Sequence, residues 1–165
     1  MTQFAEPLEV PMGRTLLALA NWARTDSRQN LTVVAASSAD FALRFPVILR
    51  RLYGESGKEL GIGATAQAYE LAAPENDQLE AQYQAWESRH RLVIGALVGR
   101  RLATLAPSAT SQRITPTALG ARSAARLAAQ PGWSVVQARA KALNSLRLSP
   151  HTLTERCRAA AGDQR

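Results

Sequence analysis

Apolar and polar positions alternate with a helical period over one long stretch, residues 76–106, which contains no proline. Positions that fall on a single face recur every three or four residues: Leu79, Tyr83, Trp86, His90, Val93, Leu97 and Arg101. This spacing is typical of an amphipathic helix. Asp77 followed by Glu80 matches an N-terminal capping box, and Pro107 cannot continue a helix. We therefore predict one helix of about 45 Å over residues 76–106, with the rest of the chain organised around it.

Two glycines, Gly95 and Gly99, lie four residues apart within this stretch. Such spacing lets two helices approach closely, either within one molecule or between two copies of the chain. It makes these glycines our candidate oligomer interface. A transmembrane span is excluded because the apolar run is short and arginines flank it, whereas a span needs about 20 apolar residues.

The residues before the long helix show shorter apolar stripes. A first helix is predicted over residues 13–24, after an arm in which Pro7 and Pro11 block regular structure. Residues 31–36 are rich in β-branched side chains, but no second convincing strand is found. We therefore favour a short buried helix or an extended segment there. Further helices are predicted around Phe41 to Leu52, with a kink or restart at Pro46, and over residues 64–73.

The only glycine-rich stretch, residues 54–63, contains the letters GESGK. A phosphate-binding loop needs a first glycine where this chain has Leu52, a Ser or Thr where it has Glu59, and a strand before it. Because all three requirements fail, we reject a nucleotide site and interpret the stretch as a connector.

The segment after Pro107 contains several residues that typically start or end helices. Thr115-Pro116 and Ser149-Pro150 each match a cap followed by an N1 proline, Ser134 is a further cap, and Pro131-Gly132 reads as a turn. Three short helices are therefore expected over residues 116–130, 135–147 and 150–160. The predicted fold is all-α: a helical bundle built around one long central helix, about 76–106, with a basic three-helix C-terminal segment. Residues 1–106 and 113–161 form either two units or one continuous domain.

Charge divides the chain into two halves. Residues 1–80 hold seven Lys/Arg and ten Asp/Glu, a balance of −3, and residues 81–165 hold thirteen and three, a balance of +10. The two balances sum to the net +7 of the chain. Eighteen of the twenty cations are arginine, as base composition of the genome could produce, but that does not explain why the acids nearly vanish after Glu87. A segment this basic attracts polyanions, chiefly nucleic acid.

The first two helices of the basic segment resemble a helix-turn-helix in their spacing. Gln, Asn, Arg and Lys side chains can read base edges, and arginine also binds phosphate. The candidate nucleic-acid-binding residues are Arg113, Arg122, Arg126, Gln137, Arg139, Lys141, Asn144 and Arg147. Three interpretations remain open: a helix-turn-helix, a bundle whose basic face contacts phosphates, and a contact with an acidic protein surface. The acidic half of this chain could itself supply that surface.

Catalytic chemistry finds no support in the sequence. His90 and His151 lie in different predicted elements without a neighbouring metal ligand, and Cys157 is not on the same helical face as His151. We expect no enzyme activity, no cofactor and no metal site. Trp22, Trp86 and Trp133 are expected to be core or interface anchors, with base stacking as an alternative for Trp133.

The leading hypothesis is a non-catalytic nucleic-acid-binding protein, either a small DNA-binding regulator or a helical subunit of a larger nucleoprotein complex. The alternative is a structural or adaptor protein that assembles through the long helix and contacts an acidic partner. A homo-oligomer or a larger complex fits either hypothesis, and no membrane partner is expected. A single cysteine and an N-terminus without signal-peptide character predict a cytoplasmic location.

Overall fold

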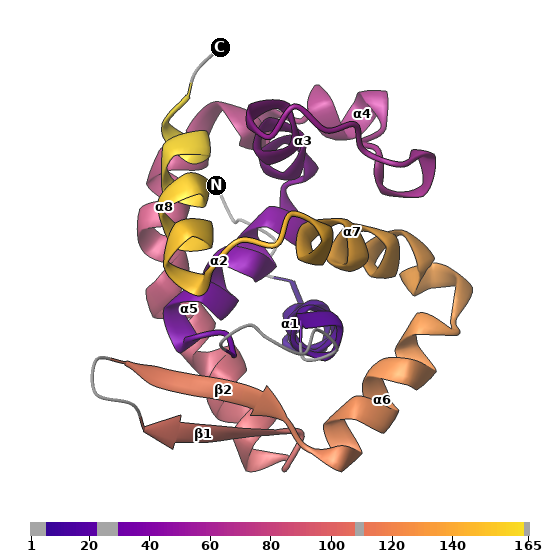
Figure 1. The fold of residues 1–165 in the computed structure, drawn as a ribbon, viewed down its shortest axis with the longest axis vertical. Coiled ribbons are helices and arrows are strands. Elements are labelled where there is room, and N and C mark those ends of the chain that lie inside the picture. The colour runs from indigo at the N-terminus through magenta and orange to yellow at the C-terminus, as the bar shows by residue number, and fades with distance from the viewer. Residues whose placement is uncertain (1–5, 23–29, 108–110, 164–165) are drawn as a thin grey trace.

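The computed structural model describes residues 6–22, 30–107 and 111–163, and these are mostly helical with one small two-stranded sheet (Figure 1). The elements in chain order are α1 (Glu9–Trp22), α2 (Val33–Arg44), α3 (Pro46–Glu55), the 3-10 turn η1 (Ile62–Ala64), α4 (Ala68–Leu71), the 3-10 turn η2 (Pro74–Gln78), α5 (Leu79–Gly99), β1 (Ala103–Pro107), β2 (Gln112–Pro116), α6 (Ala118–Ala128), the 3-10 turn η3 (Pro131–Trp133), α7 (Ser134–Ser145) and α8 (Pro150–Gly162). The expected helical class is thus confirmed in outline, and the sheet departs from it. Within the described ranges no helix is both long and apolar enough to cross a membrane.

The centre of the molecule is α1. It is seen end-on in the middle of Figure 1, and it packs against α2, α5, α6, α7 and β2. Ten of its fourteen residues are buried, including the polar residues Arg14, Thr15 and Asn21. A helix enclosed on all sides has no polar face, which is why its sequence shows only a weak amphipathic pattern.

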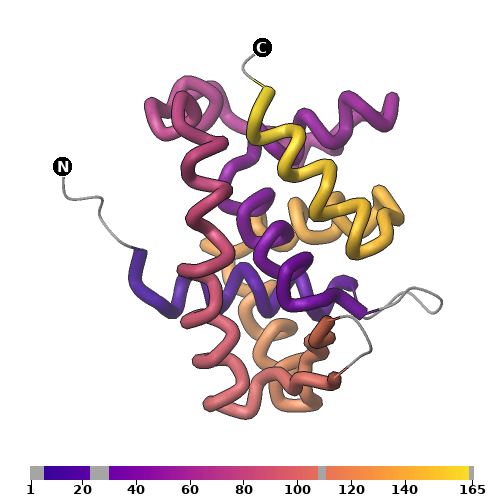
Figure 2. The backbone as a smooth tube through the Cα atoms, turned by 90° about the vertical axis from the view of Figure 1, so that its left-hand side faces the viewer, coloured from indigo at the N-terminus to yellow at the C-terminus, as the bar shows by residue number. Residues whose placement is uncertain are grey.

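The long helix α5 lies on the outside of the molecule, where it runs along one side (Figure 2). Of its twenty-one residues only five are buried, namely Leu79, His90, Val93, Ile94 and Leu97. Our expectation of a central helix over residues 76–106 was therefore wrong in place and in length. It was also wrong about the cap, because Gln78 precedes α5 and no side chain caps it there.

A change in backbone direction ends α5 well before Pro107. Arg101 has a φ of 58°, and the Leu102 N–H donates to the Leu97 carbonyl over 2.8 Å. This is the Schellman arrangement, in which a residue in the left-handed region closes the helix. Glycine usually takes that position and arginine does so here, so the stop was not visible in the sequence.

The chain then forms the hairpin that the sequence analysis missed. β1 and β2 pair antiparallel, with Thr104 opposite Thr115 and Leu105 opposite Ile114. The Ile114 N–H also donates to the Leu31 carbonyl, and Thr32 forms a bridge with Arg113. Residues 31–32 therefore add an extended edge to the hairpin before α2 begins at Val33. Long-range pairing of this kind overrides local propensity.

Prolines marked some helix boundaries correctly and others wrongly. Pro46 opens α3 directly after α2 ends at Arg44, as expected, and Ser149 caps α8 by accepting from the Thr152 N–H at 3.1 Å. Pro11 lies inside the first turn of α1, where a missing N–H costs nothing, so the predicted irregular arm was wrong there. The cap of α6 is Thr117 rather than Thr115, and Ser134 does not precede α7 but begins it.

One hydrophobic core joins the two halves of the sequence. It extends from Met12 on α1 to Ala161 on α8, and it includes the aromatic group of Phe41, Phe45, Tyr83 and Trp86. Cys157 is buried in this core, and burial raises the pKa of its thiol to about 12. The basic segment is thus packed on the acidic one rather than held apart from it.

Candidate functional site

The eight residues predicted to bind nucleic acid do not form one surface. Arg122 and Arg126 are exposed on α6, whereas Lys141 and Arg147 are exposed around the C-terminal end of α7. Arg113 on β2 is half-buried and donates to the Asn30 carbonyl over 2.6 Å. The remaining three residues, Gln137, Arg139 and Asn144, lie along α7 and are at least partly buried.

Arg139 is engaged inside the protein. Its side chain is 5% exposed and makes two hydrogen bonds to the Glu70 carboxylate, at 2.9 and 2.7 Å. Its Nε also donates to the Ala64 carbonyl over 3.3 Å. Burial alone would raise the pKa of Glu70, but the hydrogen bonds from Arg139 outweigh it and lower that pKa. A cation from the basic half is thus neutralised by an acid from the acidic half.

Two further polar residues of the basic segment face the interior. Gln137 accepts a hydrogen bond from the Asn21 amide at 3.0 Å, and Trp133 lies against Gly13, where a Cβ atom would come within 2.4 Å of its ring. Helix α7 itself packs on α1 on one side and on η1 on the other. In this structure these side chains serve the packing of α7.

Four exposed arginines lie just after the end of α5 and along α6. We call Arg100, Arg101, Arg122 and Arg126 the basic end. The Thr117 hydroxyl donates to the Arg101 carbonyl over 2.6 Å and accepts from the Gly120 N–H at 3.0 Å, so one side chain both caps α6 and fastens it to α5. Gly120 lies directly on Leu102, since a Cβ atom there would stand 1.9 Å from the Leu102 carbonyl oxygen.

A shallow groove of about 280 Å³ crosses the basic end between α1, α5 and α6. Arg100 and Arg126 line it together with Ser123 and Gln130, over an apolar floor that includes Leu97 and Leu127. Its one nearby carboxylate among the described residues is Glu9, which lies 3.7 Å from Arg100. Arg101, Arg122 and Arg126 have no ion pair within the described part of the chain.

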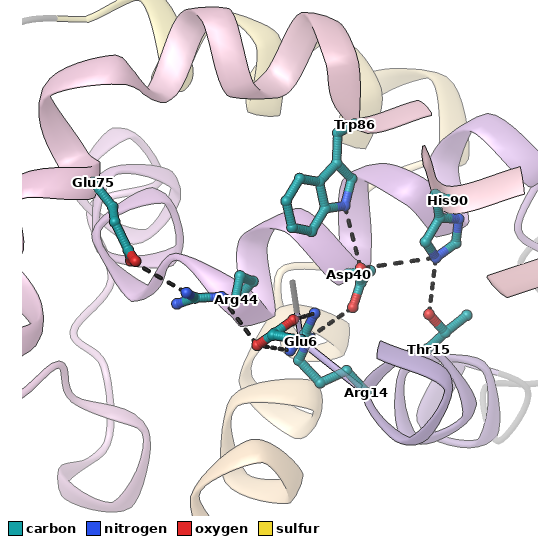
Figure 3. Close-up of polar contacts among 8 residues, drawn as sticks. All are labelled: Glu6, Arg14, Thr15, Asp40, Arg44, Glu75, Trp86 and His90. Carbon is teal, nitrogen blue, oxygen red and sulfur yellow. Dashed lines mark hydrogen bonds and ion pairs between the residues drawn. The ribbon is translucent and has the colours of Figure 1, made fainter. Parts of the chain in front are cut away.

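A second region gathers polar residues that are paired with one another and are buried or partly buried. We call Glu6, Arg14, Thr15, Asp40, Arg44, Trp86 and His90 the Asp40 cluster (Figure 3). They come from α1 and the residues just before it, from α2 and from α5. Asp40, 1% exposed, accepts from Arg14 Nε at 2.8 Å and from Trp86 Nε1 at 3.2 Å. His90 Nε2 lies 2.9 Å from Thr15 Oγ1 and 3.9 Å from Asp40 Oδ2.

Glu6 links two arginines of this cluster. Its carboxylate accepts two hydrogen bonds from Arg14, both at 2.9 Å, and lies 3.1 Å from Arg44 Nε. Arg44 in turn donates to Glu75 over 3.2 Å. Burial alone would lower the pKa of Arg14, but the charges of Asp40 and Glu6 outweigh it and raise that pKa. Arg14 is therefore a permanent buried cation held by two carboxylates.

His90 is the least satisfied member of the cluster. Its Nδ1 atom is buried, is turned away from Asp40 and Thr15 in Figure 3, and has no hydrogen-bond partner among the described residues. An unpaired buried polar atom costs about 1–3 kcal/mol. Burial lowers the pKa of His90, the charge of Asp40 raises it, and that of Arg14 lowers it further, with a net lowering. The ring is therefore neutral at pH 7.

The Asp40 cluster forms one wall of a pocket with a volume of about 600 Å³. Leu8, Phe45, Leu92 and Val93 provide apolar lining, and the exposed Arg89 stands at its rim. This volume lies in the range of small-molecule sites, which combine apolar walls with a few convergent polar groups.

The sequence analysis missed most of this cluster. Arg14, Thr15 and Asp40 are far from Trp86 and His90 in sequence, and none of these three was a candidate site residue. The buried pair of Arg14 and Asp40 joins α1 to α2 and leaves no local signal in the sequence. The one hint is the position of Arg14 in a mostly apolar run, GRTLLALANW. His90 was correctly expected to lie in the apolar stripe of α5.

The glycines proposed as an interface are exposed. No described atom lies within 4 Å of a Cβ placed on Gly95 or Gly99, so no intramolecular helix crossing uses them. The neighbouring Leu92 is 73% exposed. Among the described residues no three His, Cys, Asp or Glu side chains are grouped as metal ligands would be.

Comparison of the chain with protein-family models, with curated proteins and with solved structures found no match. Function must therefore be argued from the residues of the basic end and the Asp40 cluster.

Proposed function

We propose that this protein binds the phosphate backbone of nucleic acid through the basic end. The observation that carries the proposal is the groove that Arg100 and Arg126 line together, with one described carboxylate nearby. The exposed Arg101 and Arg122 lie next to Arg100 along the chain and one turn before Arg126 on α6, respectively. Arginine binds phosphate through two parallel hydrogen bonds, and exposed arginines remain free to do so.

The arrangement on α6 supports a bound anion. Arg122 and Arg126 lie four residues apart on one helical face, and like charges at that spacing destabilise a helix by about 0.2–0.5 kcal/mol. A phosphate between them would remove that repulsion. No described carboxylate does so.

The proposed binding does not depend on base sequence. Gln137 and Arg139, two of the eight candidate nucleic-acid-binding residues, are hydrogen-bonded within the protein. Contacts from the basic end alone would position the chain on a backbone, as a subunit of a nucleoprotein complex does. A cytoplasmic location, expected from the sequence, would place nucleic acid within reach.

Fluorescence anisotropy with duplex DNA, single-stranded DNA and RNA over a salt series tests the proposal. If all four arginines contact duplex phosphates, the logarithm of affinity should fall with the logarithm of salt concentration with a slope of roughly −3 to −4. The double substitution Arg122→Glu, Arg126→Glu should reduce affinity by at least about tenfold, since each lost phosphate contact also weakens the attraction of the others.

A matched control is Arg50→Glu, Lys58→Glu, which makes the same change in net charge at exposed positions of α3 and the turn after it. It should reduce affinity much less. An equal loss in both variants would show that net charge alone drives binding, and absence of binding at low salt would remove the proposal. A third variant, Lys141→Glu, Arg147→Glu, shows whether the surface extends to the end of α7.

The adaptor hypothesis has one observation in its favour, the exposed face of α5. Leu92 is 73% exposed, and no described atom lies within 4 Å of a Cβ placed on Gly95 or Gly99. This exposure is compatible with assembly through this helix. We retain it as the second candidate, to be tested by molecular mass in solution.

A further inference from the structure

The pocket beside the Asp40 cluster has the composition of a small-molecule site. Its apolar lining includes the two aromatic side chains Phe45 and Trp86, and its polar wall contains the guanidinium groups of Arg14 and Arg44. Neither feature is explained by binding to a phosphate backbone at the basic end.

Glu6 shows which chemical group this wall accepts. Its carboxylate receives two hydrogen bonds from Arg14 and lies 3.1 Å from Arg44, so a carboxylate already fits between the two arginines. Paired N–H groups of arginine match the two oxygens of a carboxylate in spacing and in charge.

The Glu6 carboxylate can be exchanged for another. Its side chain is 31% exposed and belongs to the residues just before α1, whereas Arg14 and Asp40 are buried within the helices. The Asp40 carboxylate holds Arg14 through a different nitrogen, Nε, at 2.8 Å, and this contact does not involve Glu6. The buried cation therefore keeps a partner, and the two arginines remain in place for an incoming anion.

We infer that this pocket binds a small aromatic or aliphatic carboxylate, whose anionic group displaces Glu6 between Arg14 and Arg44 while its apolar part lies against Phe45, Trp86 and Leu92. Glu6 then acts as an internal competitor. By occupying the anion position it reduces the fraction of molecules ready to bind, and the apparent affinity falls by the same factor.

The test uses the full chain and a matched pair of probes, 4-phenylbutyrate and its neutral amide, 4-phenylbutanamide. Binding is followed by the NMR signal of the Trp86 indole N–H, which donates to Asp40 within the pocket wall and is assigned with a Trp86→Phe variant. We expect the acid to shift this signal in a saturable way and to bind at least about tenfold more tightly than the amide, because it alone supplies a charge-assisted pair.

Three variants decide the roles of the charges. Glu6→Gln should tighten binding of the acid several-fold, because the competing charge is lost while the side chain keeps its shape. Arg44→Gln should weaken it at least about tenfold. Arg50→Gln, at an exposed position on α3 that does not line the pocket, should leave it unchanged.

Equal binding of acid and amide, or no shift with either, would overturn the inference. Unchanged affinity in Glu6→Gln would overturn the competitor role. If Arg44→Gln fails to fold by circular dichroism, the comparison of acid with amide and the response of Glu6→Gln still decide the outcome. These results are separate from nucleic-acid binding, which depends on the basic end.

Discussion

The arginines of this protein occupy two contrasting environments. In the Asp40 cluster Arg14 is buried and held by two carboxylates, and Arg139 is likewise buried against Glu70. At the basic end Arg122 and Arg126 are exposed and have no ion pair in the described ranges. The same side chain thus has a structural role in one region and is available to an external anion in the other.

This difference shows that a charge count does not measure surface charge. The second half of the chain carries a balance of +10, but Arg139 and Arg100 from that half pair with Glu70 and Glu9 from the first. Part of the asymmetry in sequence is thereby neutralised within the molecule. What remains for a partner depends on which arginines the fold leaves uncovered.

The largest loss of stability is expected when the buried ion pair between Asp40 and Arg14 is broken. Asp40→Ala removes one of the two carboxylates that hold Arg14, and leaving a buried charge poorly compensated should lower the free energy of unfolding by about 3–5 kcal/mol. Urea denaturation followed by circular dichroism measures this change.

Substitutions of exposed charged residues supply the controls for Asp40→Ala. Glu155→Ala breaks the exposed pair with Arg158, 2.7 Å apart, and should cost about 0–1 kcal/mol. Arg122→Ala, Arg126→Ala should change stability by no more than about 0.5 kcal/mol. A loss at the basic end as large as that for Asp40→Ala would show that these arginines are structural too.

A smaller loss of stability is expected when the contact between Gly120 and Leu102, which positions α6, is disturbed. Gly120→Ala places a Cβ atom 1.9 Å from the Leu102 carbonyl oxygen, so α6 must shift away from the end of α5. We expect a loss of about 1–3 kcal/mol in unfolding free energy, together with weaker binding to nucleic acid. Gly132→Ala, where no described atom lies within 4 Å, should change neither. Unaltered nucleic-acid affinity in a destabilised Gly120→Ala protein would separate α6 placement from binding.

A smaller effect is expected from pH, since it involves one proton on His90. Burial lowers the pKa of His90 below its ordinary value of 6.5, so the unfolded chain takes up that proton more readily than the folded protein. Stability should therefore be full above about pH 6.5 and should decline as pH falls from there toward the lowered pKa. Urea midpoints at pH 7.5, 6.5 and 5.5 test this. The decline should flatten in His90→Gln and persist in His151→Gln, which changes an exposed histidine.

The smallest effect belongs to the exposed face of α5. Gly95→Ala should stabilise the protein by about 0.5–1 kcal/mol, because alanine loses less backbone freedom in a helix and has open space here. Light scattering of Gly95→Leu, Gly99→Leu against the parent chain tests the interface hypothesis. A fall in mass would support assembly through these glycines, and an unchanged mass would count against it.

Local signals in the sequence were reliable where a single residue decides the backbone. Pro46 divides α2 from α3, and Ser149 with Pro150 opens α8, because a proline ring or a capping hydroxyl acts within one turn. The apolar spacing of Leu79, Val93 and Leu97 correctly indicated the buried stripe of α5. It did not indicate how much of that helix is covered.

Sequence patterns predicted the structure wrongly where a residue's conformation or burial depends on a partner far along the chain. Residues 103–107 became a strand because they pair with residues 112–116, which themselves meet Leu31. Arg139 was expected to contact nucleic acid because of its place in the helix-turn-helix spacing. The distant Glu70 and the η1 turn enclose it instead.

The sequence by itself determined a mostly helical chain, several helix boundaries and an excess of arginine in its second half. These depend on interactions within a turn or on composition alone. Only the tertiary structure decided that α1 rather than α5 is central, that Arg14 and Arg139 are buried, and that Arg100 and Arg126 line one groove. Burial and ion pairing depend on which distant segments pack together, and that packing has no period or motif in the sequence.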